Sequence, residues 1–387
     1  MKKRILFVGQ SLKIGGIERA LVDTINSLDE DEFEVDLFLF HNGGAYKSNI
    51  KRTVNIIKSN RFLDSLGRTN AEAKASVLSF VLRTSGLVLS KAIGNKTLYT
   101  IVFFFCKKLR GYDTAISFFN DIKWDGLYYG CNLFVIKKVD ALRKYAWIHA
   151  DYEKTNLNQN WNNSIYQSYE GIVNVSLAMK EKFDKLKIVP KNKSFIVYNP
   201  IDNKEILERS KDITPSLDDK TIVSVGRLEE AKGVKSLFEI AYSLQRNGFN
   251  FKWVFIGDGA LREWCKSFIE EHSLQNVVFL LGHQNNPYPY IKNAFLYVSG
   301  SHYETFGLCI AESLILNTPV VALRYDAIGE LIDGKNGIVV DDYKEMEEVI
   351  SKILNERDEY SQLKNNTRLL MDYNSIHNRQ ITALLDK

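Results

Sequence analysis

The chain has 387 residues, with 45% hydrophobic and 25% charged side chains and a formal net charge of +4 at pH 7. This composition excludes the disordered and fibrous classes of protein and is typical of a folded one. The length also exceeds the roughly 250–300 residues at which a single hydrophobic core usually divides, so we expect two domains.

The charge is unevenly distributed between the two halves of the chain. Residues 1–195 contain 30 Lys and Arg against 19 Asp and Glu, whereas residues 196–387 contain 21 against 28. A basic half predicts a first domain that faces an anionic surface or substrate, such as a bacterial inner leaflet or a lipid diphosphate. The sequence has no basic and aromatic motif of the nucleic-acid-binding kind, so we do not expect nucleic acid as a partner.

The apolar segments are short. The longest, 101–106, falls far below the roughly 20 residues that a transmembrane helix needs. The basic start at 1–4 leads into a brief apolar run that favours a first strand over a signal peptide. We therefore expect a cytoplasmic protein, with the inner face of the plasma membrane as a candidate peripheral contact.

The cysteines lack zinc-ligand spacing and are expected to be buried, reduced thiols. They are Cys106, Cys131, Cys265 and Cys309.

In chain order, the first half opens with an apolar run at 4–8, a Gly-Gly turn and helical spacing over 18–28. This pattern predicts a strand, a loop and a helix. The region 62–100 is rich in Leu, Ser and Lys and predicts helices. Further strands are predicted at 34–40, 114–118, 143–148 and 171–175.

The second half alternates more regularly between apolar runs of strand length and segments of helical periodicity. This alternation predicts a parallel sheet with helices on both faces. The predicted strands are 221–225, 252–256, 277–280, 294–298, 319–322 and 337–340. The predicted helices are 234–246, 261–271, 306–316 and 343–355.

One such unit in each half gives an α/β fold of two facing Rossmann-like domains. We place the first domain at 1–197 and the second at 198–365, because the polar stretch 199–220 is the natural boundary. A helix over 366–387 is predicted to cross back to the first domain.

A glycine-flanked loop with two cations follows the strand predicted at 221–225. Arg227 and Lys232 lie between Gly226 and Gly233, immediately before a predicted helix. Loops at the carboxyl ends of parallel strands bind ligands, and a guanidinium with an ammonium suits a diphosphate. The glycines would let the backbone approach that ligand. The alternative is a solvated turn with two surface cations.

Two glutamates lie on either side of a predicted helix start. Glu304 precedes the helix, and Glu312 lies eight positions later inside an apolar segment. That spacing, about 12 Å along a helix, is too long for one metal ion and similar to the span of a nucleotide-sugar from hexose to ribose. The N–H groups of 305–308 would face a phosphate. An unpaired buried charge is costly, so we interpret both glutamates as ligand-binding.

These motifs, in this order, resemble the signature of the family-four retaining GT-B glycosyltransferases, the group 1 glycosyl transferases of bacterial polysaccharide biosynthesis. The matching residues are Gly226-Arg227, Lys232-Gly233, Gly257-Asp258-Gly259, Gly282, Glu304-x7-Glu312 and Thr318-Pro319-Val320. The match covers 195–345 well and the first domain mainly through 15–20 and 147–149. The resemblance implies a GT-B fold, with two Rossmann-like domains on either side of a cleft.

The resemblance also implies roles for single residues. Arg227 and Lys232 would bind the donor diphosphate, Glu312 the ribose, and Glu304 the hydroxyl groups of the donor sugar. His149 would approach the sugar near the reacting centre. The remaining implied donor-binding residues are Gly15, Gly16, Gly226, Gly257, His283, Gln284, Thr305, Phe306, Gly307 and Leu308.

The implied reaction is transfer of a hexose or N-acetylhexosamine from a nucleotide diphosphate sugar, with UDP-sugars favoured over GDP-mannose. The acceptor would be a glycan or a lipid-linked molecule in capsule or O-antigen synthesis. No cofactor or metal is expected, because cationic side chains would replace magnesium and the acidic triplet 29–31 lies in a polar turn.

Other activities remain open at this point. A nucleotide-sugar epimerase and a phosphorylase occur on the same fold, and a non-catalytic nucleotide-sugar sensor would bind the donor without turnover. A dinucleotide dehydrogenase is disfavoured, because the loop 9–16 lacks the Gly-x-Gly-x-x-Gly fingerprint.

Overall fold

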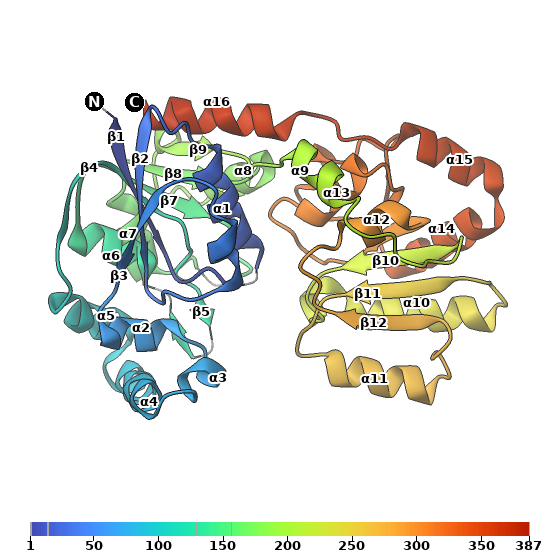
Figure 1. Cartoon of the computed structure of the whole chain (residues 1–387), viewed down its shortest axis with the longest axis horizontal. Helices are drawn as coiled ribbons and strands as arrows, with labels where there is room; N and C mark the ends of the chain where they lie inside the picture. Colours follow the sequence, from blue (N-terminus) through green and yellow to red (C-terminus); the bar gives the residue numbers. More distant parts are fainter. Residues whose placement is uncertain (1, 14, 125, 129, 156, 387) are drawn as a thin grey trace. The chain divides into compact units, whose positions relative to one another are not determined.

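The computed structural model describes residues 2–13, 15–124, 126–128, 130–155 and 157–386. Its internal contacts divide the chain into two compact units (Figure 1). Unit 1 contains Met1–Pro200 and Tyr373–Lys387, and unit 2 contains Ile201–Asp372. Each unit is built on its own parallel sheet, which confirms the predicted α/β class with two Rossmann-like domains.

The sheet of unit 1 has seven strands among the described residues, in the order β3-β2-β1-β4-β7-β8-β9. Its strands are β1 (Lys3–Gly9), β2 (Phe33–Leu39), β3 (Val54–Lys58), β4 (Leu109–Ser117), β7 (Val139–Ile148), β8 (Gly171–Asn174) and β9 (Ser194–Ile196). In β1, Leu6, Phe7 and Val8 are all fully buried. Both faces of this central strand are therefore covered, as expected for a parallel sheet between helices. A short antiparallel pair, β5 (Lys123–Trp124) and β6 (Leu127–Tyr128), lies outside the sheet.

The helices of unit 1 include several in the region 62–100, as predicted. They are α1 (Gly16–Ser27), α2 (Arg61–Gly67), α3 (Asn70–Ala73), α4 (Val77–Ile93), α5 (Asn95–Phe104), α6 (Cys131–Lys138), α7 (Asn160–Gln167), α8 (Leu177–Lys185) and α16 (Tyr373–Leu385), with 3-10 turns η1 (Ala45–Asn49) and η2 (Lys191–Lys193). The last helix, α16, packs Ile381 and Leu384 into the core of unit 1. The ring of His377 lies 2.6 Å, Nδ1 to O, from the carbonyl of Tyr198.

The sheet of unit 2 has six strands among the described residues, in the order β12-β11-β10-β13-β14-β15. They are β10 (Thr221–Val225), β11 (Lys252–Ile256), β12 (Val278–Gly282), β13 (Leu296–Ser299), β14 (Val320–Leu323) and β15 (Ile338–Val340). The helices are α9 (Asn203–Arg209), α10 (Val234–Arg246), α11 (Arg262–Glu271), α12 (Tyr288–Asn293), α13 (Leu308–Ile315), α14 (Tyr343–Asn355) and α15 (Arg357–Asn366), with 3-10 turns η3 (Glu230–Lys232) and η4 (Ile328–Glu330). In α10, Val234, Leu237, Phe238, Ala241 and Leu244 are buried, the stripe of an amphipathic helix on a sheet.

The described helices of both units are too short or too polar to span a bilayer. The four cysteines are free thiols, as predicted, with Cys131 and Cys265 buried and Cys106 and Cys309 partly buried.

Candidate functional site

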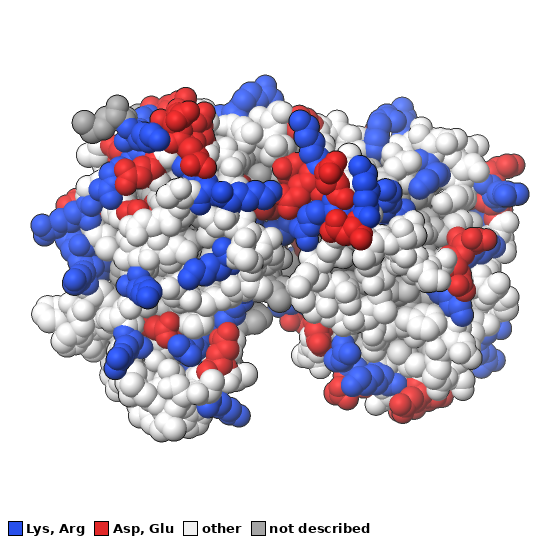
Figure 2. Space-filling view, viewed as in Figure 1, with Lys and Arg blue, Asp and Glu red and all other residues white. Residues whose placement is uncertain are grey.

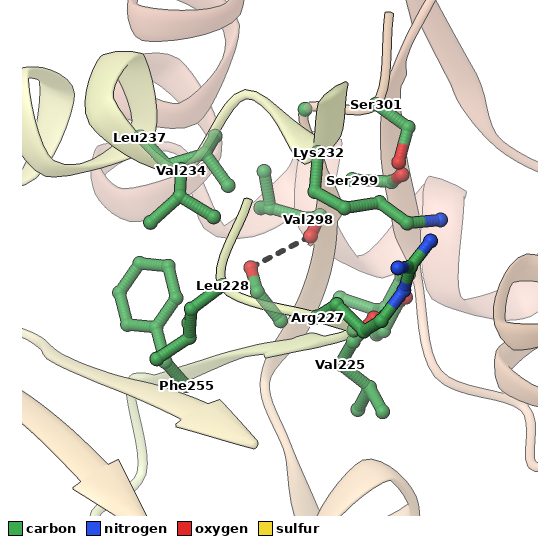
Figure 3. A pocket seen from close by; sticks show the side chains of 14 residues that line it. Val225, Arg227, Leu228, Lys232, Val234, Leu237, Phe255, Val298, Ser299 and Ser301 are labelled. Carbon is green, nitrogen blue, oxygen red and sulfur yellow. Dashed lines mark hydrogen bonds between the residues drawn. The ribbon is translucent and has the colours of Figure 1, made fainter. Parts of the chain in front are cut away.

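The candidate donor site lies in unit 2, where the loops after two neighbouring strands meet. β10 pairs with β13 in parallel, so their carboxyl ends lie at the same edge of the sheet. A pocket there is lined by residues 224–228 and 232 from the first loop and by 297–301 from the second (Figure 3). Ser224 secures its base, because its hydroxyl donates to the carbonyl of Val298 at 2.7 Å and accepts from the indole N–H of Trp253 at 3.1 Å.

Glycines allow the loops around this pocket to approach closely. Gly233 has φ +67°, and a Cβ at this position would lie 2.2 Å from both the carbonyl oxygen of Gly300 and the hydroxyl of Tyr343. That hydroxyl also donates to the Gly300 carbonyl at 2.8 Å. Gly257, at the end of β11, has φ +144°, and a Cβ there would lie 1.9 Å from the carbonyl oxygen of Gly226. Side chains at either position would separate the loops.

Gly233→Ala is therefore expected to destabilise the protein by about 1–3 kcal/mol, from both strain and steric overlap. The measurement is the free energy of unfolding of unit 2 by urea. Gly248 offers a matched control, since its φ is +79° but no atom lies within 4 Å of its Cβ position. If Gly248→Ala costs as much as Gly233→Ala, close approach of the two loops is not the reason for the glycine.

The two predicted cations both line the pocket. Arg227 and Lys232 extend their charged ends to the same side of it (Figure 3). Lys232 forms an ion pair with Glu304, whose Oε1 also accepts a hydrogen bond from the hydroxyl of Ser301 at 2.9 Å. Arg227 Nη1 lies 2.7 Å from Glu229 Oε1, and its side chain is 54% exposed. Two cations that line the same pocket repel each other, so an anion bound there would be attracted by both of them.

Glu312 lies in α13 and is only 1% exposed. Its Oε1 accepts a hydrogen bond from the hydroxyl of Tyr288 at 3.3 Å. The helix begins at Leu308, with Gly307 as N-cap at φ +102°. Phe306 is buried, and its carbonyl accepts from the hydroxyl of Tyr325 at 3.0 Å. The structure thus places Glu304 and Thr305 before the helix, and the first turn of the helix follows directly.

His283 and Gln284 follow β12 at the edge of the unit 2 sheet, two strands away from β10. The exposed ring of His283 lies 3.2 Å, Nε2 to Oδ1, from Asn285, and Gln284 donates to the carbonyl of Leu281 at 3.0 Å. Neither residue lines the pocket of Arg227 and Lys232. The structure therefore brings Arg227 and Lys232 together in one pocket and leaves His283 and Gln284 outside it.

The predicted residues of unit 1 lie at the carboxyl ends of its central strands. Gly15 is the N-cap of α1 and Gly16 its first residue. His149 directly follows β7, is 8% exposed, and packs against Phe118 with ring centroids 4.6 Å apart. Burial lowers the pKa of His149 to about 3. Its Nε2 has no hydrogen-bond partner in the described part of the chain.

Two buried residues beside His149 were not predicted. Asn120 Oδ1 accepts from the backbone N–H of His149 at 2.8 Å, and its amide donates to Tyr166 at 3.2 Å. Asp121 accepts from the backbone N–H of Asn132 at 3.2 Å, and burial raises its pKa to about 7. The signal was an Asn-Asp pair directly after an apolar strand, a position that favours ligand or positioning roles. Among the described residues, no cluster of His, Cys, Asp and Glu has the composition of a metal site.

Comparison with known proteins gives these loops a context. Residues 206–370 match the family of glycosyl transferases group 1. The matching segment makes up less than half of the chain. It contains the whole donor-site sequence from Gly226 to Glu312, and the predicted resemblance to group 1 glycosyl transferases is thereby confirmed.

Curated relatives match part of the chain. The N-acetylgalactosamine-N,N'-diacetylbacillosaminyl-diphospho-undecaprenol 4-alpha-N-acetylgalactosaminyltransferase of Campylobacter jejuni is 35% identical over 144 residues, 37% of this chain and 38% of the relative. The poly(ribitol-phosphate) alpha-N-acetylglucosaminyltransferase of Staphylococcus aureus is 28% identical over 159 residues, 41% of this chain and 31% of the relative. The chain thus spans less than two-fifths of the length of these relatives.

Solved structures match the whole chain in fold. Anabaena HepE, crystallised with UDP and glucose, superposes with a TM-score of 0.70 at 17% identity, covering 99% of both chains. TarM superposes with a TM-score of 0.67 at 15% identity, covering 100% of this chain and 99% of the other. The fold around the group 1 segment is therefore the GT-B fold, as predicted.

Proposed function

We propose that the chain is a retaining glycosyltransferase that moves a hexose or N-acetylhexosamine from a nucleotide diphosphate sugar to a glycan or lipid-linked acceptor. The observation that carries the proposal is the meeting of Arg227 and Lys232 in one pocket, with Lys232 paired to Glu304. Two cations and a helix N-terminus suit a diphosphate, and a carboxylate beside them suits sugar hydroxyl groups.

The donor roles follow from this chemistry. Arg227 and Lys232 hold the diphosphate, Glu304 accepts hydrogen bonds from the sugar hydroxyl groups, and the buried Glu312 accepts from the ribose diol. The backbone around His283 and Gln284 meets the edge of the base, and Gly15 and Gly16 form a loop under the phosphates. UDP-sugars are favoured as donors, because HepE, a protein of the same fold, was crystallised with UDP and glucose.

In the proposed reaction, a hydroxyl oxygen of the acceptor attacks the anomeric carbon from the side that the diphosphate leaves. The bond from this carbon to the diphosphate oxygen breaks, and the departing oxygen takes the proton of the hydroxyl group. Negative charge develops on the diphosphate, so Arg227, Lys232 and the N-terminus of α13 stabilise the transition state. These cations supply the charge that a magnesium ion would otherwise provide, and we propose that no metal is required.

The proposed setting is cell-surface polysaccharide synthesis at the inner face of the plasma membrane. The Campylobacter relative acts on a diphospho-undecaprenol and the Staphylococcus relative on poly(ribitol-phosphate), according to their names. Both acceptors are anionic, which agrees with the excess of Lys and Arg in residues 1–195.

A donor screen tests the proposed function. The protein is heated with UDP-, GDP-, ADP- and CMP-sugars, since a bound donor raises the melting temperature, and the stabilising donor is then assayed for nucleotide diphosphate release. Slow release without acceptor and faster release with acceptor support a transferase, and the anomeric configuration of the product by NMR tests retention. Formation of an isomeric nucleotide-sugar supports the epimerase, and stabilisation without any turnover supports the sensor.

Glu312→Gln is expected to weaken donor binding at least tenfold, because a hydrogen bond between a ribose hydroxyl and a buried carboxylate is worth about 1.5–3 kcal/mol. The measurement is the dissociation constant of the donor by calorimetry. Glu347→Gln is the matched control, since this glutamate of α14 accepts from Ser243 away from the pocket. Equal affinity of Glu312→Gln and the native protein would remove Glu312 from the ribose role.

A further inference from the structure

The helix α4 packs its small and polar side against the protein and exposes its apolar side. Its buried residues are Ser79, Arg83, Gly86 and Ser90, which recur at helical spacing and are small or polar. The exposed side carries Val77, 82% exposed, and Val88, 62% exposed, together with other large apolar residues. A helix that packs on a protein core normally has the opposite arrangement, so the polarity of α4 is inverted.

The buried face of α4 is held by specific contacts. Arg83 donates from Nη1 to the carbonyl of Leu66 at 2.8 Å and from Nε to Oδ1 of Asn70 at 2.8 Å. Gly86 lies directly against Leu66, because a Cβ at this position would be 2.3 Å from the Leu66 side chain. Rotating the helix to bury its apolar side would break both hydrogen bonds and bring larger residues against α2. The outward apolar face is therefore a fixed feature of the fold.

The next helix, α5, packs against α4 and also exposes apolar side chains. Ile101 is 49% exposed, and Phe104 and Phe105 are 77% and 74% exposed. We call the combined set the α4–α5 surface. It consists of Val77, Leu78, Phe80, Val81, Val88, Leu89, Ile93, Ile101, Phe104 and Phe105. Figure 2 shows mostly uncharged side chains on the visible face of the lobe that carries α4 in Figure 1. Large exposed apolar patches usually mark an interaction site.

The charges within the segment that carries this surface have one sign. Residues 73–112 contain seven Lys and Arg and no Asp or Glu. Lys74 and Lys91 lie near the two ends of α4, Lys96 lies in the first turn of α5, and Lys107 follows it; all four are exposed. Long basic side chains at the ends of an apolar helix can reach phosphate groups while the helix lies below them.

We propose that the α4–α5 surface inserts into the headgroup region of an anionic lipid bilayer, with α4 parallel to the membrane plane. This inference deepens the proposed function, because it rests on a membrane-associated acceptor and names the element that reaches the membrane. An apolar face rimmed by cations matches both the acyl boundary and the phosphates of such a bilayer. A second copy of the chain fits less well, since a two-fold interface would bring the same cations together with no carboxylate from residues 73–112 to pair with them.

The test is co-sedimentation of the full chain with vesicles. One set contains equal parts of phosphatidylglycerol and phosphatidylcholine, and the other contains phosphatidylcholine alone. The native protein is expected to bind the anionic vesicles and to lose binding as salt is raised. Phe80→Ser combined with Val81→Ser and Val88→Ser is expected to weaken this binding by about a hundredfold, because three apolar side chains no longer enter the lipid. Lys74→Gln with Lys91→Gln and Lys96→Gln is expected to weaken it by about tenfold or more, and only on anionic vesicles.

The matched control replaces three exposed apolar residues elsewhere, with Leu142→Ser, Leu177→Ser and Ile213→Ser, and is expected to bind like the native protein. Equal loss in this control, or no binding of the native protein to anionic vesicles, overturns the proposal. A dimer seen by sedimentation velocity without lipid, and lost in the α4 variant, would also overturn the proposal, because the surface would then be a protein interface.

Donor turnover without vesicles is measured in parallel and should not change in the α4 variant. Vesicle binding without any turnover would overturn the proposed enzyme while leaving the membrane surface intact.

Discussion

Replacing Arg227 and Lys232 together with alanine is expected to lower kcat by about a thousandfold or more, since removal of a single preorganised charge-stabilising group already costs about a hundredfold to a thousandfold. Both side chains line the same pocket from the loop after β10. Because the charge on the diphosphate grows as its bond to the sugar breaks, the loss should be larger in kcat than in donor affinity. Steady-state nucleotide diphosphate release, with the chosen donor and acceptor, measures both.

Two controls separate this effect from general charge loss and from unfolding. Arg246→Ala with Lys266→Ala removes two exposed cations from α10 and α11 of the same unit and should leave kcat unchanged. The partly exposed pair of Lys232 and Glu304 contributes about 1 kcal/mol or less to stability, so the double variant should remain folded at the assay temperature. Near-native rates in a folded double variant would refute the diphosphate assignment.

His149→Ala is expected to lower kcat by about a hundredfold or more with little change in donor affinity. Burial lowers the pKa of the imidazole to about 3, so the ring is neutral at pH 7. Its Nε2 is buried without a partner in the described part of the chain, and buried polar atoms normally have one, such as an ordered water or a bound ligand. In the proposed role it forms a hydrogen bond with the donor sugar near the reacting centre.

The pH profile and a second histidine make this prediction specific. A residue with a pKa near 3 does not titrate between about pH 5 and 8, so His149 should contribute no inflection to kcat in that range. His377 is the matched control, because it is also buried in unit 1, with a pKa lowered to about 4 by burial. His377→Ala should lower stability while leaving kcat unchanged. Equal activity of His149→Ala and the native protein would assign His149 to the core.

The sequence predicted unit 2 more completely than unit 1. The bounds of β10, β11, α10 and α14 agree with the predicted segments, because buried strands are uninterrupted apolar runs and amphipathic helices have a clear period. The edge strand β3 was missed. None of its five residues is fully buried and two are exposed, so no strong apolar run marked it. The last helix was predicted over 366–387, whereas the structure begins α16 at Tyr373 and ends it at Leu385.

The charged part of the candidate site could be predicted because its signals are local. Arg227, Lys232 and Glu304 each follow a strand and stand beside a glycine or a helix start, and strand order then brings their loops together. Asn120 and Asp121 could not be assigned in the same way. Their importance comes from burial beside His149 and at the start of α6, and such contacts between distant segments leave no periodic trace in the sequence. The inverted face of α4 was hidden for a similar reason, since apolar residues alone do not show which side packs inward.

The position of α16 in unit 1 has a consequence for how the chain folds during translation. Unit 1 consists of residues 1–200 and 373–387, so unit 2 is inserted within it. The ribosome therefore releases all of unit 2 before α16 can pack Ile381 and Leu384 into the unit 1 core. Until α16 has been synthesised, part of the core of unit 1 stays uncovered, whereas unit 2 can fold from one continuous segment of the chain. We therefore expect the folding of unit 1 to depend more on chaperones, and to be more sensitive to premature stop codons, than the folding of unit 2.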